Sequence, residues 1–536
     1  MNPVAGQIAG SASRFVCLSL TVARLKYLLH MLQLEEYDPR RFGRWVVVHP
    51  RRLFANEPLD GLGVLGVIVL VARPSTTRAI VITASVTAIL GLWGLWKEYR
   101  LMRVPAKKPL VMTPRASRLL VCGTILTAAI SIVPVVINGW ETLFFSILLP
   151  ILAPVILLVS RYVMEPLESG IRQWYMQDAR SKLAQLQPTI IGITGSYGKT
   201  STKYFLTHLL ASRFEVLMTP ESYNTAMGIC RVIREQLGPE HRVFVVELAE
   251  NEPGGFRRLF SLVRCDMSIV VSVGLQHLEE FGSEHLICDV MRGFVTMDGS
   301  GKTVVVNADD STLGYMMHVP GKRLVRTSTD VEKDADFHAE NVIADSSGIT
   351  FDIVDTQGIR IHCHSSLLGR HNVKNVLLAV AAAREMGISW PLIQAQIETL
   401  QAPPHRLQVL HDAGGVRIID DAFNANPEGF AMAMDVLASF PSRRVLVTPG
   451  LVSLGRAEKE ENVQAGRRAA AAADTVVLVG ARQTQSLRQG LLSAEFHESS
   501  IITANSLQDV AGILRTLIVA GDTVLFENDL PDTYNE

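Results

Sequence analysis

Three long runs without a charged residue constrain what this chain can fold into. They cover Ala79–Trp96, Leu119–Trp140 and Leu143–Ser160, and each has 18 or more residues. At 1.5 Å per residue of helix, such a run is long enough to cross the hydrocarbon core of a bilayer. A fourth apolar run, Gly61–Ala72, is shorter and also fits a segment that enters the membrane and returns. We therefore predict an α-helical membrane domain over residues 59–160, with about four transmembrane helices.

Positive charge is concentrated in particular segments around these runs. Lys97–Arg118 carries seven Lys/Arg against one Glu, whereas the Glu141–Thr142 turn carries no Lys or Arg. Loops rich in Lys and Arg stay on the cytoplasmic side of a membrane. Residues 1–58 also carry eight Lys/Arg. We therefore predict a cytoplasmic N-terminal segment, a multi-pass location in the plasma membrane, and a linker helix over residues 161–187 that leads to a cytoplasmic catalytic region.

The predicted N-terminal segment contains an amphipathic pattern. Between Phe15 and Leu34, large apolar residues recur at helical spacing, with Arg24 and Lys26 among them. This pattern is typical of a helix that lies on a membrane surface. A helix packed on the protein's own soluble domain explains the pattern equally well, so both interpretations remain open.

Composition excludes several classes of protein. A mean hydropathy of +0.23 with 19% charged residues is too apolar for an ordinary soluble enzyme, although residues 185–536 alone read as a soluble protein. The net charge of -1 offers no basic surface, so we expect no nucleic-acid partner. The six cysteines form no CxxC pair and no His/Cys ligand spacing, which argues against a zinc site.

A glycine-containing loop follows the first apolar strand of the soluble half. The strand covers Thr189–Gly195, and a helical pattern begins near Tyr204. A strand, a glycine loop with Gly-Lys-Thr, and a helix together place backbone N–H groups around phosphates. Lys199 would neutralise the β- and γ-phosphates, and the Thr200 hydroxyl would bind Mg²⁺. The predicted nucleotide-binding residues of this loop are Gly195, Ser196, Gly198, Lys199, Thr200 and Ser201.

The stretch Gly192–Thr202 resembles the compact P-loop of the Mur ligases, and four further stretches agree with that family in order. They are Val246-Glu247-Leu248, Gln276–Ser283, Leu368–Asn375 and Asp420–Pro427. The resemblance covers roughly residues 185–536 and is nearest to the members that add D-alanyl-D-alanine to a peptidoglycan precursor. It implies a P-loop Mur ligase central domain over residues 188–402 and a Rossmann-like C-terminal domain over residues 403–536.

The resemblance also implies a reaction and its participants. Mur ligases use ATP and Mg²⁺ to join a carboxylate of a cell-wall precursor to an amino acid or dipeptide through an acyl phosphate. The metal would spread the charge that develops on the phosphates. The residues that match the family's motifs are Thr200, Glu247 and His277 for the metal; Asn372 and Asn375 for the adenine base; Arg406 and Asp421 for nucleotide binding; and Lys199, His277, Arg406 and Asp421 for catalysis.

The chain departs from the family pattern at three positions and at its front. Met291 stands where several members have a lysine that holds a second Mg²⁺ as a carbamate, and Asp289 is an alternative source of the missing carboxylate. Ser453 replaces an expected Glu, and Phe423 lacks a phenol hydroxyl. The membrane segments replace the small domain that binds UDP in soluble members, which suggests a lipid-linked precursor and contact with membrane lipids.

Two other functions remain as alternatives. Met291 and Ser453 also fit a catalytically weak or inactive nucleotide-binding membrane protein that regulates or scaffolds cell-envelope assembly. An energised transporter is disfavoured because the Leu-Ser-Gly-Gly-Gln signature is absent. Release of ADP that depends on an amine would separate the ligase from both.

Alternating strands and helices predict a mostly parallel sheet in the central domain and a second α/β unit after Arg406. Residues 336–364 read as a β-rich insertion, and Asn372–Gly387 as a helix. The predicted strands are Val243–Glu247, Ser268–Val273, Thr303–Asn307, Thr350–Val354, Arg360–His364, Arg417–Asp420, Arg444–Thr448, Thr475–Val479, Ser500–Ile502 and Thr523–Phe526.

Overall fold

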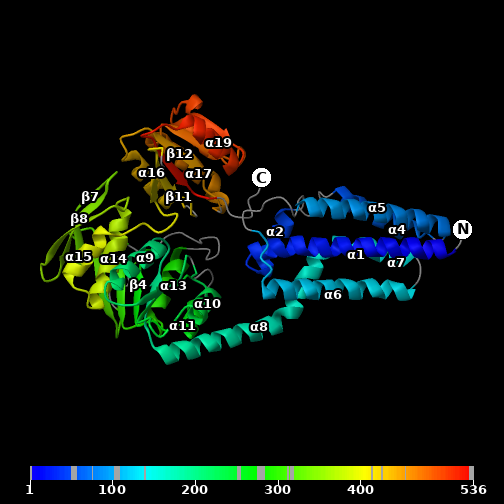
Figure 1. Ribbon diagram of the computed structural model, residues 1–536, viewed down its shortest axis with the longest axis horizontal. Coiled ribbons are helices and arrows are strands. Elements are labelled where there is room, and N and C mark those ends of the chain that lie inside the picture. Colours follow the sequence, from blue (N-terminus) through cyan, green and yellow to red (C-terminus); the bar gives the residue numbers. More distant parts are fainter. Residues whose placement is uncertain are drawn as a thin grey trace. The chain divides into compact units, whose positions relative to one another are not determined.

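A computed structural model gives the fold (Figure 1). It describes residues 3–49, 57–74, 76–101, 109–137, 140–221, 223–249, 255–273, 284–310, 313, 319–411, 414–423, 426–452 and 454–529. The chain divides into a helical unit, which ends at Gln173, and an α/β unit, Trp174–Leu530. Each unit is described by itself.

The helical unit contains the predicted apolar helices. By length and composition, Ile8–Leu34, Thr77–Arg100 and Pro114–Ile132 could each cross a membrane, and a helix pair bent by 73° at Leu152 could form a fourth span. The helix that covers Gly61–Ala72 is apolar but shorter. The helices are α1 (Pro3–Leu34), α2 (Pro39–Val48), α4 (Glu57–Ala72), α5 (Thr77–Leu101), α6 (Pro114–Ile137), α7 (Trp140–Ile151) and the start of α8 (Ala153–Leu186).

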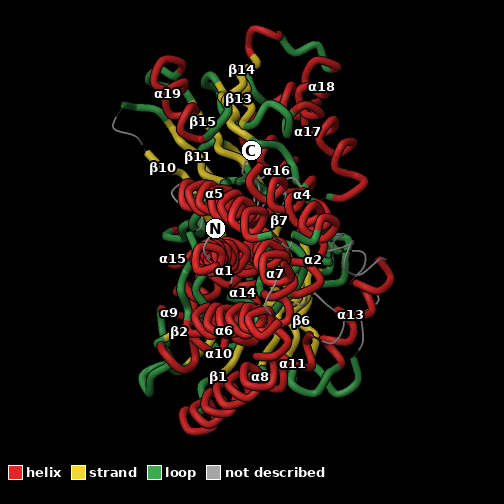
Figure 2. The backbone as a smooth tube through the Cα atoms, turned by 90° about the vertical axis from the view of Figure 1, so that its right-hand side faces the viewer, coloured by secondary structure: helices red, strands yellow, loops and turns green. Residues whose placement is uncertain are grey.

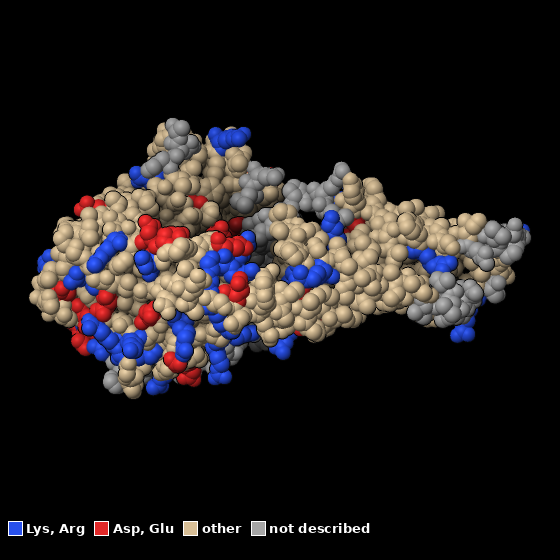
Figure 3. All heavy atoms as spheres, turned by 60° about the horizontal axis from the view of Figure 1, so that its bottom comes forward, with Lys and Arg blue, Asp and Glu red and all other residues tan. Residues whose placement is uncertain are grey.

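The surface of the helical unit carries the apolar side chains expected of helices in contact with lipid. Val71 on α4 is 77% exposed and Ile89 on α5 is 65% exposed. In Figure 3 the surface of these helices is mostly uncharged, whereas the α/β unit shows mixed acidic and basic side chains. Between the helices, Gly91 and Gly94 of α5 lie against Val16 and Leu20 of α1. Small residues of this kind let transmembrane helices approach closely.

Helix α1 differs from the prediction for residues 15–34. Within the helical unit it packs between α5, α6 and α7 (Figure 2). The physical reason is that Arg24, which indicated an interfacial helix, is buried in an ion pair with Glu98 of α5 at 3.1 Å. Paired in this way, the charge is accommodated inside the bundle.

The direction of α1 bears on the predicted cytoplasmic N-terminal segment, which stays a prediction. Val16, Leu20 and Arg24 meet Gly91, Gly94 and Glu98 in the same order, so α1 and α5 run parallel. The end of α1 therefore lies at the same end of the bundle as the end of α5, and Gln33 donates to the Val111 carbonyl, just before α6, at 2.9 Å. The first turn of α1 lies at the opposite end.

Two sheets organise the α/β unit. The first has nine strands in the order β2-β3-β1-β4-β5-β6-β7-β8-β9, parallel through β7 and antiparallel beyond it. The predicted insertion at 336–364 thus extends the main sheet as an antiparallel edge. Its strands are β1 (Thr189–Thr194), β2 (Val216–Met218), β3 (Val243–Glu247), β4 (Met267–Val270), β5 (Thr303–Asn307), β6 (Arg323–Ser328), β7 (Phe337–Asp345), β8 (Gly348–Asp355) and β9 (Arg360–Ser365).

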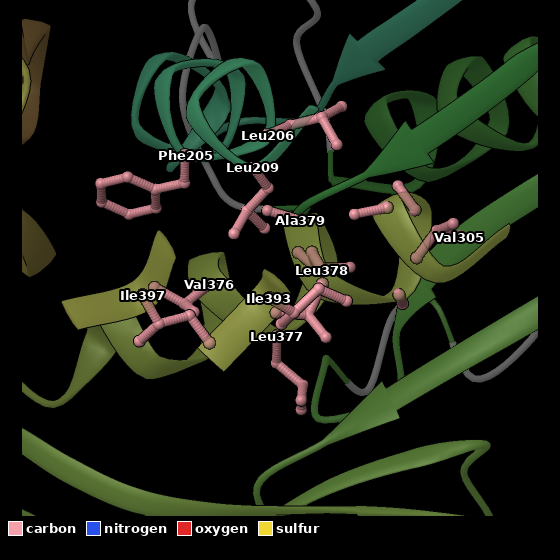
Figure 4. Close-up of a cluster of buried hydrophobic side chains, with 14 of the residues drawn as sticks. Phe205, Leu206, Leu209, Val305, Val376, Leu377, Leu378, Ala379, Ile393 and Ile397 are labelled. Carbon is pink, nitrogen blue, oxygen red and sulfur yellow. The ribbon is translucent and has the colours of Figure 1, made fainter. Parts of the chain in front are cut away.

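Helices cover both faces of this sheet and form two cores. On one face, side chains of α9, α14 and α15 meet β5 around Phe205, Leu206 and Val305 (Figure 4). The other face carries α10, α11, α13 and the end of α8. The helices are α9 (Lys199–Ala211), α10 (Ala226–Glu235), α11 (Gly255–Leu262), α13 (Glu284–Thr296), α14 (His371–Glu385) and α15 (Trp390–Glu398).

The end of α8 is part of the catalytic domain rather than a free linker. Ala179 is fully buried in the second core, and Tyr175, Met176, Leu183 and Leu186 pack against it. The sequence of 161–187 mixes apolar and charged residues because one side of the helix is buried while the other side remains in solvent.

The second sheet has six strands in the order β10-β11-β15-β12-β13-β14, with only β10 antiparallel. This is the predicted Rossmann-like C-terminal domain. Its elements are β10 (Gln408–His411), β11 (Arg417–Asp421), α16 (Pro427–Ala438), β12 (Arg444–Thr448), η2 (Gly455–Ala457), α17 (Glu458–Ala472), β13 (Thr475–Val479), α18 (Gln485–Ser493), η3 (Glu498–Ser500), β14 (Ile501–Ala504), α19 (Leu507–Leu517) and β15 (Thr523–Glu527).

Candidate active site

The predicted phosphate loop lies between β1 and α9, at the carboxyl end of a central parallel strand. Gly195 has a φ of 137° and Gly198 a φ of 81°. A Cβ at Gly195 would lie 2.8 Å from the Ser272 carbonyl, and one at Gly198 would lie 2.4 Å from Asn375 Oδ1. Only glycine fits these two positions. Gly198 caps α9, so the amides of the first turn point toward the loop.

Ser272 lies two residues after the end of β4 and holds the phosphate loop in place through hydrogen bonds. The Ser196 amide donates to the Ser272 carbonyl at 2.7 Å, and the Tyr197 amide donates to Ser272 Oγ at 3.1 Å. Ser272 Oγ donates in turn to the Tyr197 carbonyl. The sequence did not identify Ser272, because nothing in its local pattern indicates a contact 75 residues away.

Lys199 lies over this loop and is partly buried. Its Nζ donates to the carbonyls of Gly195 at 2.6 Å and Ser196 at 3.0 Å. Desolvation lowers the pKa of Lys199 to about 8; Glu247 opposes this effect, and Arg406 adds to it. A cation beside the loop glycines suits the neutralisation of phosphate oxygens. Ser201 lies in the first turn of α9 and is partly exposed.

Glu247, at the end of β3, collects three side-chain donors. Thr200 Oγ1 and Lys203 Nζ each donate to Oε2 at 3.0 Å, and Asn224 Nδ2 donates to Oε1 at 3.3 Å. Both Glu247 and Lys203 are almost fully buried. Burial lowers the pKa of Lys203, while Glu247 raises it. Breaking such a buried pair on one side costs about 3–5 kcal/mol.

The Thr200–Glu247 pair fits the predicted magnesium ion. Two neighbouring oxygens in an octahedral shell of radius about 2.1 Å are about 3 Å apart, which matches the 3.0 Å between these two oxygens. Mg²⁺ typically takes one or two carboxylates and completes its shell with phosphates and water. Within the described ranges no group of three His, Cys, Asp or Glu gathers around a metal-sized space. His277, the third predicted ligand, lies outside the described residues, as does Ser453.

Position 291 does not contribute to this site. Met291 is 7% exposed and lies in the apolar core with Phe256, Phe260 and Phe294. Asp289, on the same helix, is exposed. The side chain of residue 291 thus faces the interior of the domain, so its identity fits packing rather than metal binding.

The predicted adenine-side asparagines are buried near the loop. Asn372 Nδ2 donates to the Leu368 carbonyl at 2.8 Å, and Asn375 Nδ2 donates to Asn372 Oδ1 at 3.2 Å. The oxygen of Asn375 lies against Gly198. The structure therefore brings Asn375 to the phosphate loop, and Asn372 orients it. Their predicted contact with the base stays a prediction.

Arg406 and Asp421 face the loop from the C-terminal domain. The Arg406 guanidinium lies 4.2 Å from the centre of the Phe423 ring. Burial lowers the pKa of Arg406, while Asp421 and Glu247 raise it. Burial raises the pKa of Asp421 to about 6, against the opposing effects of Arg406 and the Leu407 amide. Phe423 thus gives Arg406 a flat apolar support that needs no phenol hydroxyl.

A strained connection places Arg406. His405 and Leu407 both have left-handed backbones, with φ of 60° and 47°. His405 Nδ1 lies 2.7 Å from Asp420 Oδ2, and the Leu407 amide donates to Asp421 Oδ1 at 3.1 Å. These bonds hold the two strained residues, a pattern common at functional sites.

Besides Ser272, the site contains two residues that the motifs did not identify. Lys203 lies one helical turn beyond Lys199, so its direction toward Glu247 follows from the helical period. Asn224 reaches Glu247 from the segment before α10 and carried no local signal. Together the site offers a cationic phosphate loop, a hydroxyl–carboxylate pair for a divalent ion, and an arginine from a second domain. This arrangement can hold a nucleoside triphosphate and stabilise charge on its terminal phosphate.

Comparison with known families agrees with this geometry. Residues 193–383 match the model of the Mur ligase middle domain, and residues 405–527 match that of the Mur ligase glutamate ligase domain. The first range contains the phosphate loop and Glu247, and the second contains Arg406 and Asp421.

Curated relatives point to the same family. The UDP-N-acetylmuramoyl-tripeptide–D-alanyl-D-alanine ligase of Escherichia coli is 31% identical, over 60% of this chain and 72% of the relative. The ligase of the same name from Mycobacterium tuberculosis is also 31% identical, over 63% of this chain and 69% of the relative.

Solved structures share the fold. MurF from Acinetobacter baumannii has a TM-score of 0.60 and 25% identity, over 67% of this chain and 78% of that one. The MurF ligase from Thermotoga maritima, in complex with ADP, has a TM-score of 0.58 over 67% of this chain and 80% of that one, and at 23% identity shows the fold alone. With its two family domains and its match to most of the Escherichia coli enzyme, the chain belongs to the Mur ligase family of ATP-dependent, ADP-forming ligases.

Proposed function

We propose that this Mur ligase joins a carboxylate of a membrane-borne cell-wall precursor to the amine of an amino acid or dipeptide. The observation that carries the proposal is the convergence of Lys199, Thr200, Glu247 and Arg406 in one α/β unit. The relatives are named for UDP-N-acetylmuramoyl-tripeptide and D-alanyl-D-alanine, which supports a peptide acceptor and a dipeptide amine as the substrate classes.

The reaction takes place in two steps. An oxygen of the acceptor carboxylate attacks the γ-phosphorus of ATP, and the bond to the ADP oxygen breaks to leave an acyl phosphate and ADP. The amine nitrogen then attacks the carbonyl carbon, the bond to the phosphate oxygen breaks, and phosphate leaves. Lys199 and the loop amides hold the phosphates, while Arg406 faces the charge that develops during transfer. A Mg²⁺ ion held by Thr200 and Glu247 would neutralise phosphate oxygens.

The acceptor's attachment to the membrane is supported by the helical unit. The matched family ranges begin at residue 193, and the helices before them include three that could cross a membrane. An enzyme fixed beside the bilayer meets a lipid-linked substrate at a high effective concentration. We place the protein in the plasma membrane with its ATP site in the cytoplasm, where the basic segment 97–118 also belongs.

One observation favours a second candidate, a nucleotide-binding protein that regulates or scaffolds envelope assembly without efficient turnover. Met291 stands where several family members have a lysine that holds a second metal, and its side chain lies in the apolar core. Only turnover separates the two candidates, because both bind ATP.

The test is ADP release by the full chain purified in detergent. Two acceptors with the same peptide are compared, one linked to UDP and one to a polyprenyl lipid, each with and without D-alanyl-D-alanine. We expect release that requires amine and acceptor, higher kcat/KM for the lipid-linked acceptor, and loss in Lys199→Ala. Arg231→Gln, on the exposed face of α10, is the matched control. Turnover with the UDP-linked acceptor alone would remove the membrane-borne substrate, and nucleotide binding without any turnover would favour the regulatory candidate.

A further inference from the structure

Four arginines gather at the end of the helical unit that holds the start of α6. Arg115 and Arg118 lie in the first turns of α6, and Arg161 and Arg172 lie on α8. Charged neighbours of Arg115 include Arg161, Arg172 and Glu168. These side chains belong to none of the matched family domains, which begin at residue 193.

Two glutamates of α8 pair with three of these arginines. Arg118 binds Glu168 through two nitrogens, at 2.7 and 3.0 Å. Arg172 binds Glu165 at 2.6 Å, and Arg161 binds the same carboxylate. Four arginines against two glutamates leave an excess of two positive charges. In the adjacent α1–α2 turn, Glu36 pairs with Arg41, and Asp38 accepts from the first backbone amides of α2.

Arg115 is the arginine whose hydrogen-bonding capacity is left open. Its Nε is buried and has no hydrogen-bond partner among the described residues. Its guanidinium lies 4.2 Å from the centre of the Tyr37 ring, which supports it from one side. A guanidinium has five donors in a fixed fork that matches the oxygens of a phosphate.

Tyr37 is itself held in place by a strained turn. Glu36 and Tyr37 both have left-handed backbones, with φ of 55° and 62°. Gln33 Nε2 donates to the Tyr37 hydroxyl at 3.0 Å, and Arg161 Nε donates to its carbonyl at 3.3 Å. Strain held by surrounding bonds is typical of positions that serve a ligand.

The surroundings of the cluster are apolar and exposed. Val111 and Met112 precede α6, and Tyr162, Val163 and Leu167 lie along α8; all five side chains are at least 46% exposed. A cationic cluster bordered by exposed apolar side chains, at the end of helices that could cross a membrane, suits a ligand with both phosphate and hydrocarbon parts.

We propose that Arg115, Arg118, Arg161 and Arg172 form a binding site for the diphosphate ester of a lipid-linked acceptor. The excess of positive charge, together with the guanidinium of Arg115, which makes no ion pair among the described residues, matches a diphosphate, and the flanking apolar side chains would contact the lipid chain. The inference rests on the proposed function, because it assigns the anchoring group of the same acceptor. The site lies wholly within the helical unit, so it can be tested without turnover.

The experiment measures binding to the full chain in phosphatidylcholine nanodiscs without ATP. The probes are a polyprenyl diphosphate, phosphatidylglycerol and inorganic pyrophosphate. We expect the polyprenyl diphosphate to bind, and Arg115→Gln to weaken it about tenfold or more, as loss of charged hydrogen bonds does. Arg231→Gln should bind as the wild type does. Pyrophosphate should compete only weakly, because it lacks the lipid chain.

Several results would overturn the site. One is equal affinity of Arg115→Gln and wild type, and another is competition by phosphatidylglycerol as strong as by the polyprenyl diphosphate. Unchanged ATP binding and thermal unfolding establish that Arg115→Gln is folded; if it is not, Arg172→Gln, whose side chain is 33% exposed, replaces it. Ligase turnover with a UDP-linked acceptor in a chain that fails the binding test would refute this site alone. Lipid binding without turnover on any acceptor would instead refute the proposed function.

Discussion

Asp421 and Arg406 form a charged pair whose ionisation should control activity. Burial raises the pKa of Asp421 from its ordinary 3.8 to about 6. Its protonated form therefore favours the folded state below pH 3.8, and this stabilisation is lost as the pH rises through about 6. The ionised form attracts the Arg406 guanidinium, and we expect activity to need this form. We expect kcat/KM for ADP release to fall as the pH drops through about 6, and the acid limb to vanish in Asp421→Asn. A profile that stays flat down to pH 5 would contradict this role.

Met291 gives a second prediction about a single residue. Because its side chain lies among Phe256, Phe260 and Phe294, Met291→Lys would bury an ammonium group without a partner. We expect a loss of about 3 kcal/mol or more in the free energy of unfolding and no gain in metal-dependent activity. Denaturant titration measures the loss, with Asp289→Lys on the exposed side of the same helix as the control. A stable and more active Met291→Lys would show that the residue reaches the metal site.

Sequence reasoning found the site residues whose role is local. Lys199 and Thr200 follow an apolar strand in a short motif, and Glu247 ends another apolar strand, so their types and positions could be read from the sequence. Ser272 and Asn224 act through contacts that form only when the chain folds, and no motif or residue spacing in the sequence indicates these contacts. The lysine expected at 291 could not be judged from the motif, since burial of that helix face is a tertiary property.

The end of α8 gives a prediction about a whole secondary-structure element, namely how much this helix end stabilises the catalytic domain. Ala179, Leu183 and Leu186 belong to the core of the catalytic domain, although the sequence placed a domain boundary near residue 188. We expect a fragment of residues 188–536 to unfold more easily than one of residues 172–536, by about 5 kcal/mol for the lost apolar burial. Denaturation midpoints measure the difference, with Leu183→Asp in the longer fragment as a control. Equal midpoints would mean that the helix contributes nothing to the domain.

Strand prediction succeeded where burial is continuous. The bounds of β3, β5, β12 and β13 agree with the sequence to the residue, because parallel strands buried on both faces read as apolar runs. Strand β2 has three residues and was missed. The edge formed by β7–β9 was taken for an insertion, because β6, the strand through which it joins the rest of the sheet, was not predicted.

Labelling at the two ends of the helical unit tests the direction of α1. Because α1 runs parallel to α5, the first turn of α1 and the segment before α6 should lie on opposite sides of the membrane. We expect a membrane-impermeant thiol reagent to label Ile8→Cys from outside intact cells and Met112→Cys only after lysis, each in a cysteine-free background. Both positions are exposed. Labelling of both from the same side would contradict a membrane-spanning α1.

At the same scale, the sequence predicted a membrane region followed by two α/β domains, and the structure has a helical unit with three helices that could cross a membrane, followed by the two α/β sheets. It did not predict that α1 joins the bundle, because the partner of Arg24 is Glu98, 74 residues away. A charged residue on an apolar helix suggests a helix at the membrane surface only as long as its charged partner on another helix is unknown.

The central claim is that this chain activates an acceptor carboxylate with ATP, and trapping the acyl phosphate tests it most directly. Full-length protein is given ATP, Mg²⁺ and the acceptor without an amine substrate, and hydroxylamine is added to convert an acyl phosphate into a hydroxamate. We predict hydroxamate on the acceptor in amounts that depend on ATP, and none from Lys199→Ala. Nucleotide binding by the wild type with no hydroxamate from either the lipid-linked or the UDP-linked acceptor would contradict the account.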